Sequence, residues 1–386
     1  MNLTPSSKIV IVGGGVAGLA TAWALARRGL GMITLVEREE GCFRVSSGQN
    51  AAILRHATDS PATRNLTRRT RDLLHAPPAD LCHEPLVDER GLVVLEGNEQ
   101  TPLPWWADEL LADDSCQTLS PKELASKAPG FVGEGARAWW FPHSGTIDIA
   151  RLGASLERSA RATGVAFRLG TGVKRLKTDS SGAVTGVVLE NDESLSADLV
   201  VLAAGAWAGE LGAAVNAEFP GRPTRRHLFV TQPETRLDPN QPVIWDDAAP
   251  FYYRPEAQGL LLCIGDQDDC PPSVASGADP LVLRAARRAL ARRLPQFEGL
   301  KFARAWAATR TMTEDDTPVV GADPRVAGLF WVAALGGHGM SLSLGLGDLA
   351  ASMIAQDEVQ DAQLVAALAP HAPRRDWIPQ RDWVQS

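Results

Sequence analysis

The stretch KIVIVGGGVAGLATAWALARRGLGMITLVERE, Lys8 to Glu39, constrains the fold more than any other part of the sequence. It begins with a continuous β-branched run, Ile9 to Val12, which is typical of a parallel strand buried on both faces. Glycines follow, and then an apolar spacing typical of a helix that ends near Gly29. A second buried strand over residues 33–36 completes the unit. This order of strand, glycine turn, helix and strand predicts a dinucleotide-binding unit.

Three glycines and one acid in this unit have separate expected roles. Gly13 would form the tight turn, Gly15 would let the backbone approach a pyrophosphate, and Gly18 would let helix and strand pack closely. Glu37 follows the second strand, where a carboxylate binds a ribose diol and disfavours the additional phosphate of NADP. The unit alone is compatible with both NAD and FAD.

Two later segments repeat the pattern of a buried strand that opens onto small residues. Residues 199–202, LVVL, lead into the small-residue stretch AAGAW at 203–207. Near the C-terminus, a strand over 329–333 precedes the glycine turn GGHG at 336–339 and a helix from about Ser341 to Ala355. Because the ends of parallel strands meet at one edge of a sheet, these segments predict one extended cofactor that crosses that edge.

Composition limits the partners and the compartment. The chain has 386 residues, which suffices for two domains, and its net charge of -8 disfavours nucleic acid as a partner. The five cysteines are widely spaced, and no His, Asp or Glu grouping has metal-ligand spacing. No apolar run approaches the length of a membrane span. We therefore expect a cytoplasmic protein with no metal, no nucleic acid and no membrane span, whose oligomeric state the sequence does not indicate.

Eight segments, in order and at their intervals, carry a resemblance to a known family. After the N-terminal unit come SSGQNAAILRH, SGTIDIARL, LVVLAAGAWAGEL, PTRRHLFV, PFYYRPE, ATRTMTEDDTPVVG and the C-terminal GGHGM. Together they resemble the FAD-dependent D-amino acid oxidase superfamily, which includes glycine oxidase, sarcosine oxidase and bacterial D-amino acid dehydrogenases. The resemblance extends over nearly the whole chain.

The resemblance implies an α/β fold, with a Rossmann-like FAD-binding domain and an interleaved α+β substrate domain built on an antiparallel sheet. We expect the FAD-binding domain to comprise residues 1–80, 150–215 and 315–370, and the substrate domain 81–149 and 216–314, with a C-terminal tail at 371–386. Short β-prone runs separated by Pro, Gly and Asp lie between the cofactor segments, which agrees with antiparallel strands.

The resemblance also implies FAD as the cofactor. ATRTMTEDD contains no cysteine where sarcosine oxidases attach their flavin, so we expect FAD to be bound non-covalently. The expected FAD contacts are Gly13, Gly15, Val16, Ala17, Gly18, Glu37, Arg38, Ser47, Gln49, Asn50, Val173, Ala204, Gly205, Trp207, Gly336, Gly337, His338, Gly339 and Met340. The helix N-terminus after the GGHG turn would stabilise negative charge on the flavin.

The chemistry of such a site favours positioning cations over a strong base. Hydride transfer to a flavin requires the substrate C–H to be fixed beside the ring, and Arg binds a carboxylate bidentately. The resemblance places Arg310, Arg55 and Arg226 at the substrate carboxylate. It places Tyr252 over the substrate and His338 near the flavin.

Two of these assignments leave alternatives. Strand alternation lets only one of Tyr252 and Tyr253 face the flavin, and His338 has the alternative of only shaping its turn. Sarcosine oxidases carry a Lys where this chain has Ser341, which disfavours sarcosine as the substrate.

We therefore predict an FAD-dependent amine or amino acid oxidoreductase, with a D-configured or N-substituted amino acid favoured by the resemblance. Hydride transfer to flavin would give an imine that hydrolyses to a 2-oxo acid and ammonia or amine, and oxygen or a quinone would accept the electrons. The alternatives are oxidation of a 2-hydroxy acid and a flavoprotein subunit of a multi-subunit amino acid dehydrogenase. The three arginines also suggest the hypothesis of a dianionic substrate.

Overall fold

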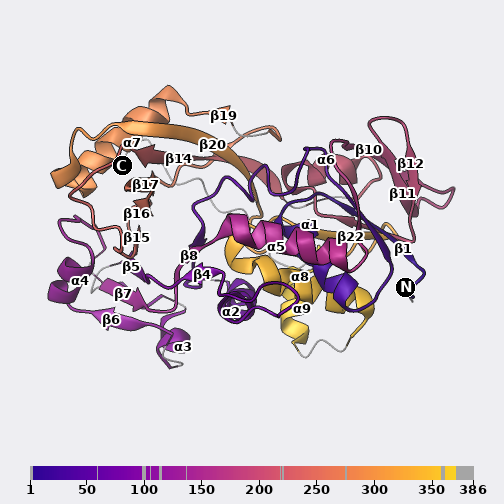
Figure 1. Ribbon diagram of the computed structural model, residues 1–386, viewed down its shortest axis with the longest axis horizontal. Coiled ribbons are helices and arrows are strands. Elements are labelled where there is room, and N and C mark those ends of the chain that lie inside the picture. The colour runs from indigo at the N-terminus through magenta and orange to yellow at the C-terminus, as the bar shows by residue number, and fades with distance from the viewer. Residues whose placement is uncertain are drawn as a thin grey trace.

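The glycine-rich unit lies at the centre of a sheet in one lobe of the computed structural model (Figure 1). The structure describes residues 3–58, 60–97, 101–104, 106–112, 115–135, 137–217, 219, 221–273, 276–357 and 361–370. Within these ranges the sheet has six strands, in the order β21 (Val319–Ala322), β22 (Leu329–Ala333), β13 (Leu199–Leu202), β1 (Lys8–Val12), β2 (Met32–Val36) and β9 (Ala166–Arg168). Neighbouring strands are parallel, except that β21 is antiparallel to β22. The strands predicted from the sequence at 9–12, 33–36, 199–202 and 329–333 are confirmed.

Different elements pack on the two faces of this sheet. Ile9 and Ile11 pack with four helices, namely α1 (Val16–Arg27), α2 (Pro61–His75), α5 (Ile149–Ala162) and α8 (Gly339–Ala355). Val10 and Val12 face the opposite side and pack with a small antiparallel sheet of β10 (Val173–Thr178), β11 (Val184–Leu189) and β12 (Ser194–Ser196). Alternating side chains of one strand thus enter two separate cores, as expected for a parallel sheet covered on both faces.

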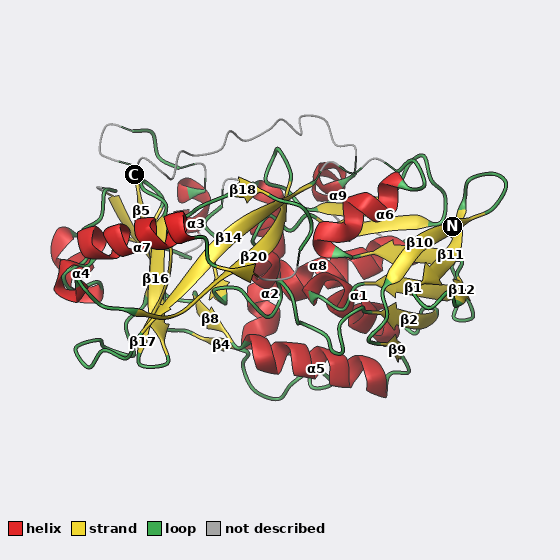
Figure 2. Ribbon diagram, turned by 90° about the horizontal axis from the view of Figure 1, so that it is seen from above, coloured by secondary structure: helices red, strands yellow, loops and turns green. Residues whose placement is uncertain are grey.

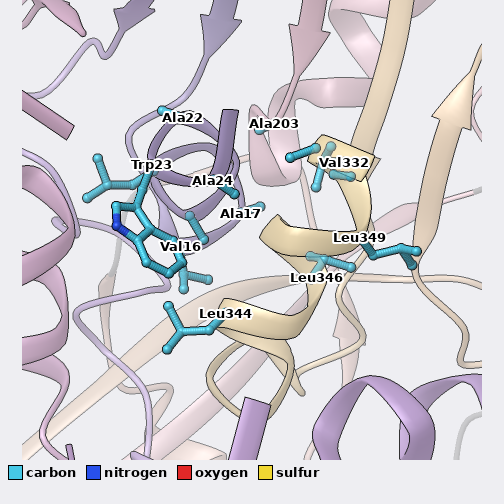
Figure 3. Packing of buried hydrophobic residues seen from close by; sticks show 14 of the residues in the cluster. Val16, Ala17, Ala22, Trp23, Ala24, Ala203, Val332, Leu344, Leu346 and Leu349 are labelled. Carbon is cyan, nitrogen blue, oxygen red and sulfur yellow. The ribbon is translucent and has the colours of Figure 1, made fainter. Parts of the chain in front are cut away.

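Helix α8 lies against α1 at close range. Leu344, Leu346 and Leu349 of α8 belong to the same apolar cluster as Val16 and Trp23 of α1 (Figure 3). A Cβ atom added to Gly347 would lie 2.6 Å from the backbone carbon of Ala20. The two helices can approach this closely because the position has no side chain.

The second lobe is built on a larger sheet, whose path runs β19 (Ser276–Gly277), β20 (Phe302–Met312), β14 (Arg222–Thr231), β17 (Gly259–Cys263), β16 (Phe251–Glu256), β15 (Val243–Asp246), β5 (Leu92–Glu96), β7 (Arg137–Phe141) and β6 (Gln117–Leu119). A tenth strand, β18 (Asp268–Asp269), pairs with β14. The described pairings are antiparallel, as predicted, except that β15 is parallel to β5. Helix α7 (Pro280–Arg293) covers one face, and β14 and β20 extend toward the first lobe (Figure 2).

The remaining elements connect these layers. They are the short sheet β3 (Ile53–Leu54), β8 (Gly145–Ile147) and β4 (Val87–Asp88), the helices α3 (Ala107–Ala112), α4 (Pro121–Lys127), α6 (Ala208–Ala213) and α9 (Ala362–Leu368), and the 3-10 turns Gly205–Trp207 and Pro295–Phe297. The expected tail at 371–386 lies outside the described residues, and the residue boundaries of the two domains stay a prediction. Within the described ranges, no helix is long and apolar enough to cross a membrane.

The contact between α1 and α8 predicts the effect of Gly347→Ala. Helix propensity alone would stabilise the variant by about 1 kcal/mol. The new methyl group, however, would meet the Ala20 backbone at 2.6 Å, so we expect a net destabilisation of about 1–3 kcal/mol. Denaturant unfolding followed by circular dichroism measures this difference. A stability equal to or above that of the wild type would contradict the packing argument.

Candidate active site

A cavity of about 1130 Å³ lies where the two lobes meet. Its wall is formed by residues that follow β1, β2, β13 and β22 in the first lobe and by residues of β14, β16 and β20 in the second. Pockets for drug-sized ligands usually measure about 300–1,000 Å³. The cavity therefore has room for a large ligand and a small one together.

The residues predicted to contact the cofactor come together in this cavity. Its wall includes Gly13, Gly15, Val16, Ala17, Glu37, Arg38, Ser47, Gln49, Asn50, Val173, Ala204, Gly205, Trp207, Gly336, Gly337, His338, Gly339 and Met340. Gly18 does not line it. A Cβ atom on Gly18 would lie 2.0 Å from the carbonyl oxygen of Gly13, so this glycine allows α1 to pack on the turn beneath the cavity.

Two helices begin at the cavity without a side-chain cap of their own. The N-cap residues are Gly15 for α1 and His338 for α8, and neither makes a side-chain capping bond. The N–H of Val16 instead donates to Oγ of Ser47 at 2.9 Å. Because helix N-termini carry partial positive charge, both starts favour negatively charged ligand groups at this wall.

The turn between β1 and α1 is held in shape by Gly13 and Glu37. Gly13 has φ +110, and a Cβ there would lie 2.4 Å from the carbonyl oxygen of Ala203. The Glu37 carboxylate accepts from the Gly14 N–H at 2.5 Å and from the Glu39 N–H at 2.9 Å. The carboxylate expected to bind a ribose thus also fixes the glycine turn.

At the other end of the cavity, Arg226 of β14 and Arg310 of β20 face the same space. Nη2 of Arg226 donates to Oε1 of Gln267 at 3.0 Å, whereas its Nε has no hydrogen-bond partner. In the described part of the chain, neither guanidinium forms an ion pair with a carboxylate. Burial lowers the pKa of Arg310, and the charge of Arg226 lowers it further. This end of the cavity is therefore prepared for an anion.

Tyr252 lines the same cavity as the two arginines, and Tyr253 does not. Tyr252 lines the cavity, and its ring stacks on Trp245 with centroids 4.2 Å apart. Tyr253 points to the other face of the sheet, where its hydroxyl accepts from Nε2 of Gln241 at 2.9 Å. Burial raises the pKa of Tyr252, so its hydroxyl remains a hydrogen-bond donor at neutral pH.

Arg55, expected at the substrate carboxylate, lines the cavity but already has a partner for its charge. Its guanidinium is paired with the carboxylate of Asp247 and lies 4.3 Å from the ring centroid of Trp245. Nε1 of Trp245 donates to the same carboxylate at 2.7 Å. The backbone N–H of Arg55 donates to Oγ of Ser341 at 2.9 Å, so Ser341 fixes this segment on α8. Arg55 is held by protein groups and its charge is balanced.

His338 lies at the start of α8, with Nε2 3.5 Å from a carboxylate oxygen of Asp316. The sequence analysis did not identify Asp316, nor did it identify Trp245, Asp247 and Gln267, although all of them line the cavity. The β-prone run VIW before Asp246-Asp247 was the available signal for Trp245 and Asp247. Gln267 follows a strand end and carries no comparable signal.

Comparison with known families identifies the chain. The sequence profile of the family described as "DAO: FAD dependent oxidoreductase" matches residues 8–353. The chain belongs to this family of FAD-dependent oxidoreductases. It is 26% identical to FAD-dependent oxidoreductase domain-containing protein 1 of Bos taurus, over 93% of this chain and 83% of that protein. It is 27% identical to glycine oxidase of Geobacillus kaustophilus, over 92% of this chain and 95% of that protein. L-proline dehydrogenase from P. horikoshii has the same fold, with a TM-score of 0.84, 20% identity and coverage of 97% and 99% of the two chains.

The cavity of this FAD-dependent oxidoreductase fits its cofactor. The glycine turn at Gly13 and the two helix starts, whose N-cap residues make no side-chain bond, suit a pyrophosphate and an electron-rich ring. Two polar atoms of residues in the cavity wall, Nη2 of Arg38 and Oε1 of Gln49, are buried without a hydrogen-bond partner in the described residues. Buried polar atoms are normally satisfied, so these two indicate a ligand. The individual FAD contacts remain proposals.

Glu37 provides a test of the cofactor end in this oxidoreductase. In Glu37→Gln an amide N–H would face one of the two backbone N–H groups that now donate to the carboxylate. Losing one charge-assisted bond of about 1.5–3 kcal/mol should weaken FAD binding about tenfold or more. Fluorescence titration of the apoprotein with FAD measures this. Glu40→Gln, at an exposed position outside the cavity, is the matched control, and equal affinities for both variants would contradict the role of Glu37.

Proposed function

We propose that the protein oxidises the C–N bond of an α-amino acid or N-substituted amino acid. The substrate carbon loses a hydride, the amine nitrogen loses a proton, and the resulting imine is hydrolysed to a 2-oxo acid and ammonia or amine. The two electrons pass on to oxygen or a quinone. Bound FAD supplies the acceptor for the hydride.

The observation that carries this proposal is the pair Arg226 and Arg310. Both guanidiniums face the cavity without an ion-pair partner in the described residues. Arg310 lies against Gly337, where an added Cβ would meet its Nη1 at 2.6 Å. Two unpaired cations at a cavity wall would bind a carboxylate bidentately and fix the substrate carbon relative to the turn.

Tyr252 and the ion pair of Arg55 complete the proposed substrate site. The protonated hydroxyl of Tyr252 would donate a hydrogen bond to the same carboxylate or to a polar substituent. Trp245 and Arg55 stack behind it and form a wall that excludes water from the substrate carbon. Orientation and exclusion of water are the main contributions that such a site needs from the protein.

The substrate class is tested by mixing the FAD-loaded protein with D- and L-amino acids, N-methyl amino acids and 2-hydroxy acids without oxygen. We expect loss of the visible flavin absorbance with an amine-bearing compound. Readmitted air then distinguishes an oxidase from a dehydrogenase that requires a quinone. Reduction by 2-hydroxy acids alone would contradict the proposed C–N oxidation. Failure with every compound, together with co-purified partner chains, would favour the subunit role.

Binding of the substrate carboxylate by Arg310 is tested with the variant Arg310→Met. Removing one charged partner of a desolvated ion pair costs about 2–5 kcal/mol, so we expect substrate or carboxylate affinity to fall about 100-fold. FAD content should remain unchanged. Arg304→Met changes an arginine at the exposed end of the same strand and is the matched control. Equal carboxylate affinities in the two variants would contradict the assignment of Arg310.

A further inference from the structure

A second pair of side chains lies directly beneath the Arg226 contact, on the opposite face of the sheet. Strand β18 pairs with β14 so that Asp269 faces Thr224 and Asp268 faces Arg225. Continued along the chain, this register places Gln267 opposite Arg226 and Asp266 opposite His227. The hydrogen bond from Arg226 to Gln267 and the contact between His227 and Asp266 follow this register. Because side chains alternate along strands, Gln267 points into the cavity and Asp266 points away from it.

Hydrogen bonds define the protonation of this lower pair. The backbone N–H of Asp279, at the start of α7, donates to Nε2 of His227 at 3.0 Å. That nitrogen therefore carries no proton, and the imidazole is neutral with its proton on Nδ1. Nδ1 donates to Oδ2 of Asp266 at 2.6 Å, and the His227 backbone N–H donates to the same carboxylate at 3.1 Å. Asp266 thus accepts from the imidazole and from the backbone of His227, and its carboxylate acts only as an acceptor in these bonds.

This charge is buried close to the two arginines of the cavity. The side chains of Asp266 and His227 are both fully buried, at 0% exposure. Burial and the charge of Arg226 lower the pKa of Arg310, whereas Tyr252, Cys263 and then the charge of Asp266 act in the opposite sense. The pKa of Arg226 is raised by Cys263, by Tyr252 and then by the charge of Asp266, against the effect of burial. Away from bulk water, charges on the two faces of one sheet interact without strong screening.

We propose that Asp266, fixed by its hydrogen bonds to His227, is the internal counter-ion of Arg226 and Arg310 and limits the site to a ligand with one negative charge. This inference rests on the proposed function, because it assumes that the arginine pair binds the substrate carboxylate. The two arginines and the one buried anion beneath them leave a single positive charge for the ligand. Arg55 adds none because Asp247 balances it, and Asp316 lies against His338 rather than against the arginines. The substrate class is then amino acids with one carboxylate, and the dianionic hypothesis from the sequence is replaced.

The test compares butanoate with succinate, which have the same chain length and differ by one carboxylate. Calorimetric titration of the FAD-loaded protein at fixed ionic strength measures both dissociation constants. We expect the wild type to prefer butanoate. Asp266→Asn, of nearly the same shape, should shift the ratio of the two constants about tenfold in favour of succinate.

A second variant changes the charge in the opposite direction without altering the buried pair. Gln267→Glu adds a negative charge beside Arg226 at the cavity wall, so it should weaken succinate binding more than butanoate binding. Asp269→Asn is the matched control. It removes a carboxylate from the same segment, but one that is 49% exposed and paired with Arg222, and it should leave the ratio unchanged.

Different outcomes contradict different statements. If Asp266→Asn weakens both ligands equally, or if wild type prefers succinate, the counter-ion role is wrong while the carboxylate site stands. If Asp266→Asn does not fold, an unchanged ratio in Gln267→Glu is the result that overturns the proposal. If wild type binds neither ligand, the arginine pair is not a carboxylate site, and the proposed function fails together with this inference.

Discussion

Close approach between backbone segments at a few glycines determines where the site can form. A side chain at Gly18 would collide with the carbonyl oxygen of Gly13. A side chain at Gly13 would in turn collide with the carbonyl oxygen of Ala203. Gly347 similarly lets α8 rest on Ala20 of α1. These contacts hold two helices so that their N-termini open onto one cavity. The electrostatic character of the cofactor end therefore follows from packing that requires the absence of side chains.

The two ends of the cavity obtain positive potential in different ways. At the cofactor end it comes from backbone N–H groups, which cannot be titrated and carry no net charge. At the other end it comes from Arg226 and Arg310, which bring two full charges into a region with little water. Full charges of like sign at close range are costly, so a buried carboxylate nearby stabilises the arginine pair. Asp266 is placed to do this without occupying any part of the cavity wall.

The sequence predicts local features well and the pairing of distant side chains poorly. The strand at 9–12, the glycine turn and the helix after it are specified by continuous patterns, and all are found. Alternation within one strand restricted the cavity-facing tyrosine to one of Tyr252 and Tyr253, and the structure selects Tyr252. The ion pair of Arg55 with Asp247 could not be read from the sequence, because the two residues lie 192 positions apart and meet only through the packing of two lobes. Asp266 and Gln267 carry no local pattern, since sheet register alone gives them their partners.

Register between β14 and β20 is the reason that the two arginines form a pair. Arg226 lies opposite Ala308, and Arg310 lies opposite Thr224, so the guanidiniums belong to diagonal neighbours on one face. A shift of either strand by one residue would turn its arginine to the face that α7 covers. The irregularity in this ladder falls between Val230 and Thr231, beyond the positions of the arginines, so the pairing is regular where the site requires it. The same register continues into β18 and brings Gln267 and Asp266 to Arg226 and His227. One run of strand pairing therefore sets both the charges that face the ligand and the charge that balances them.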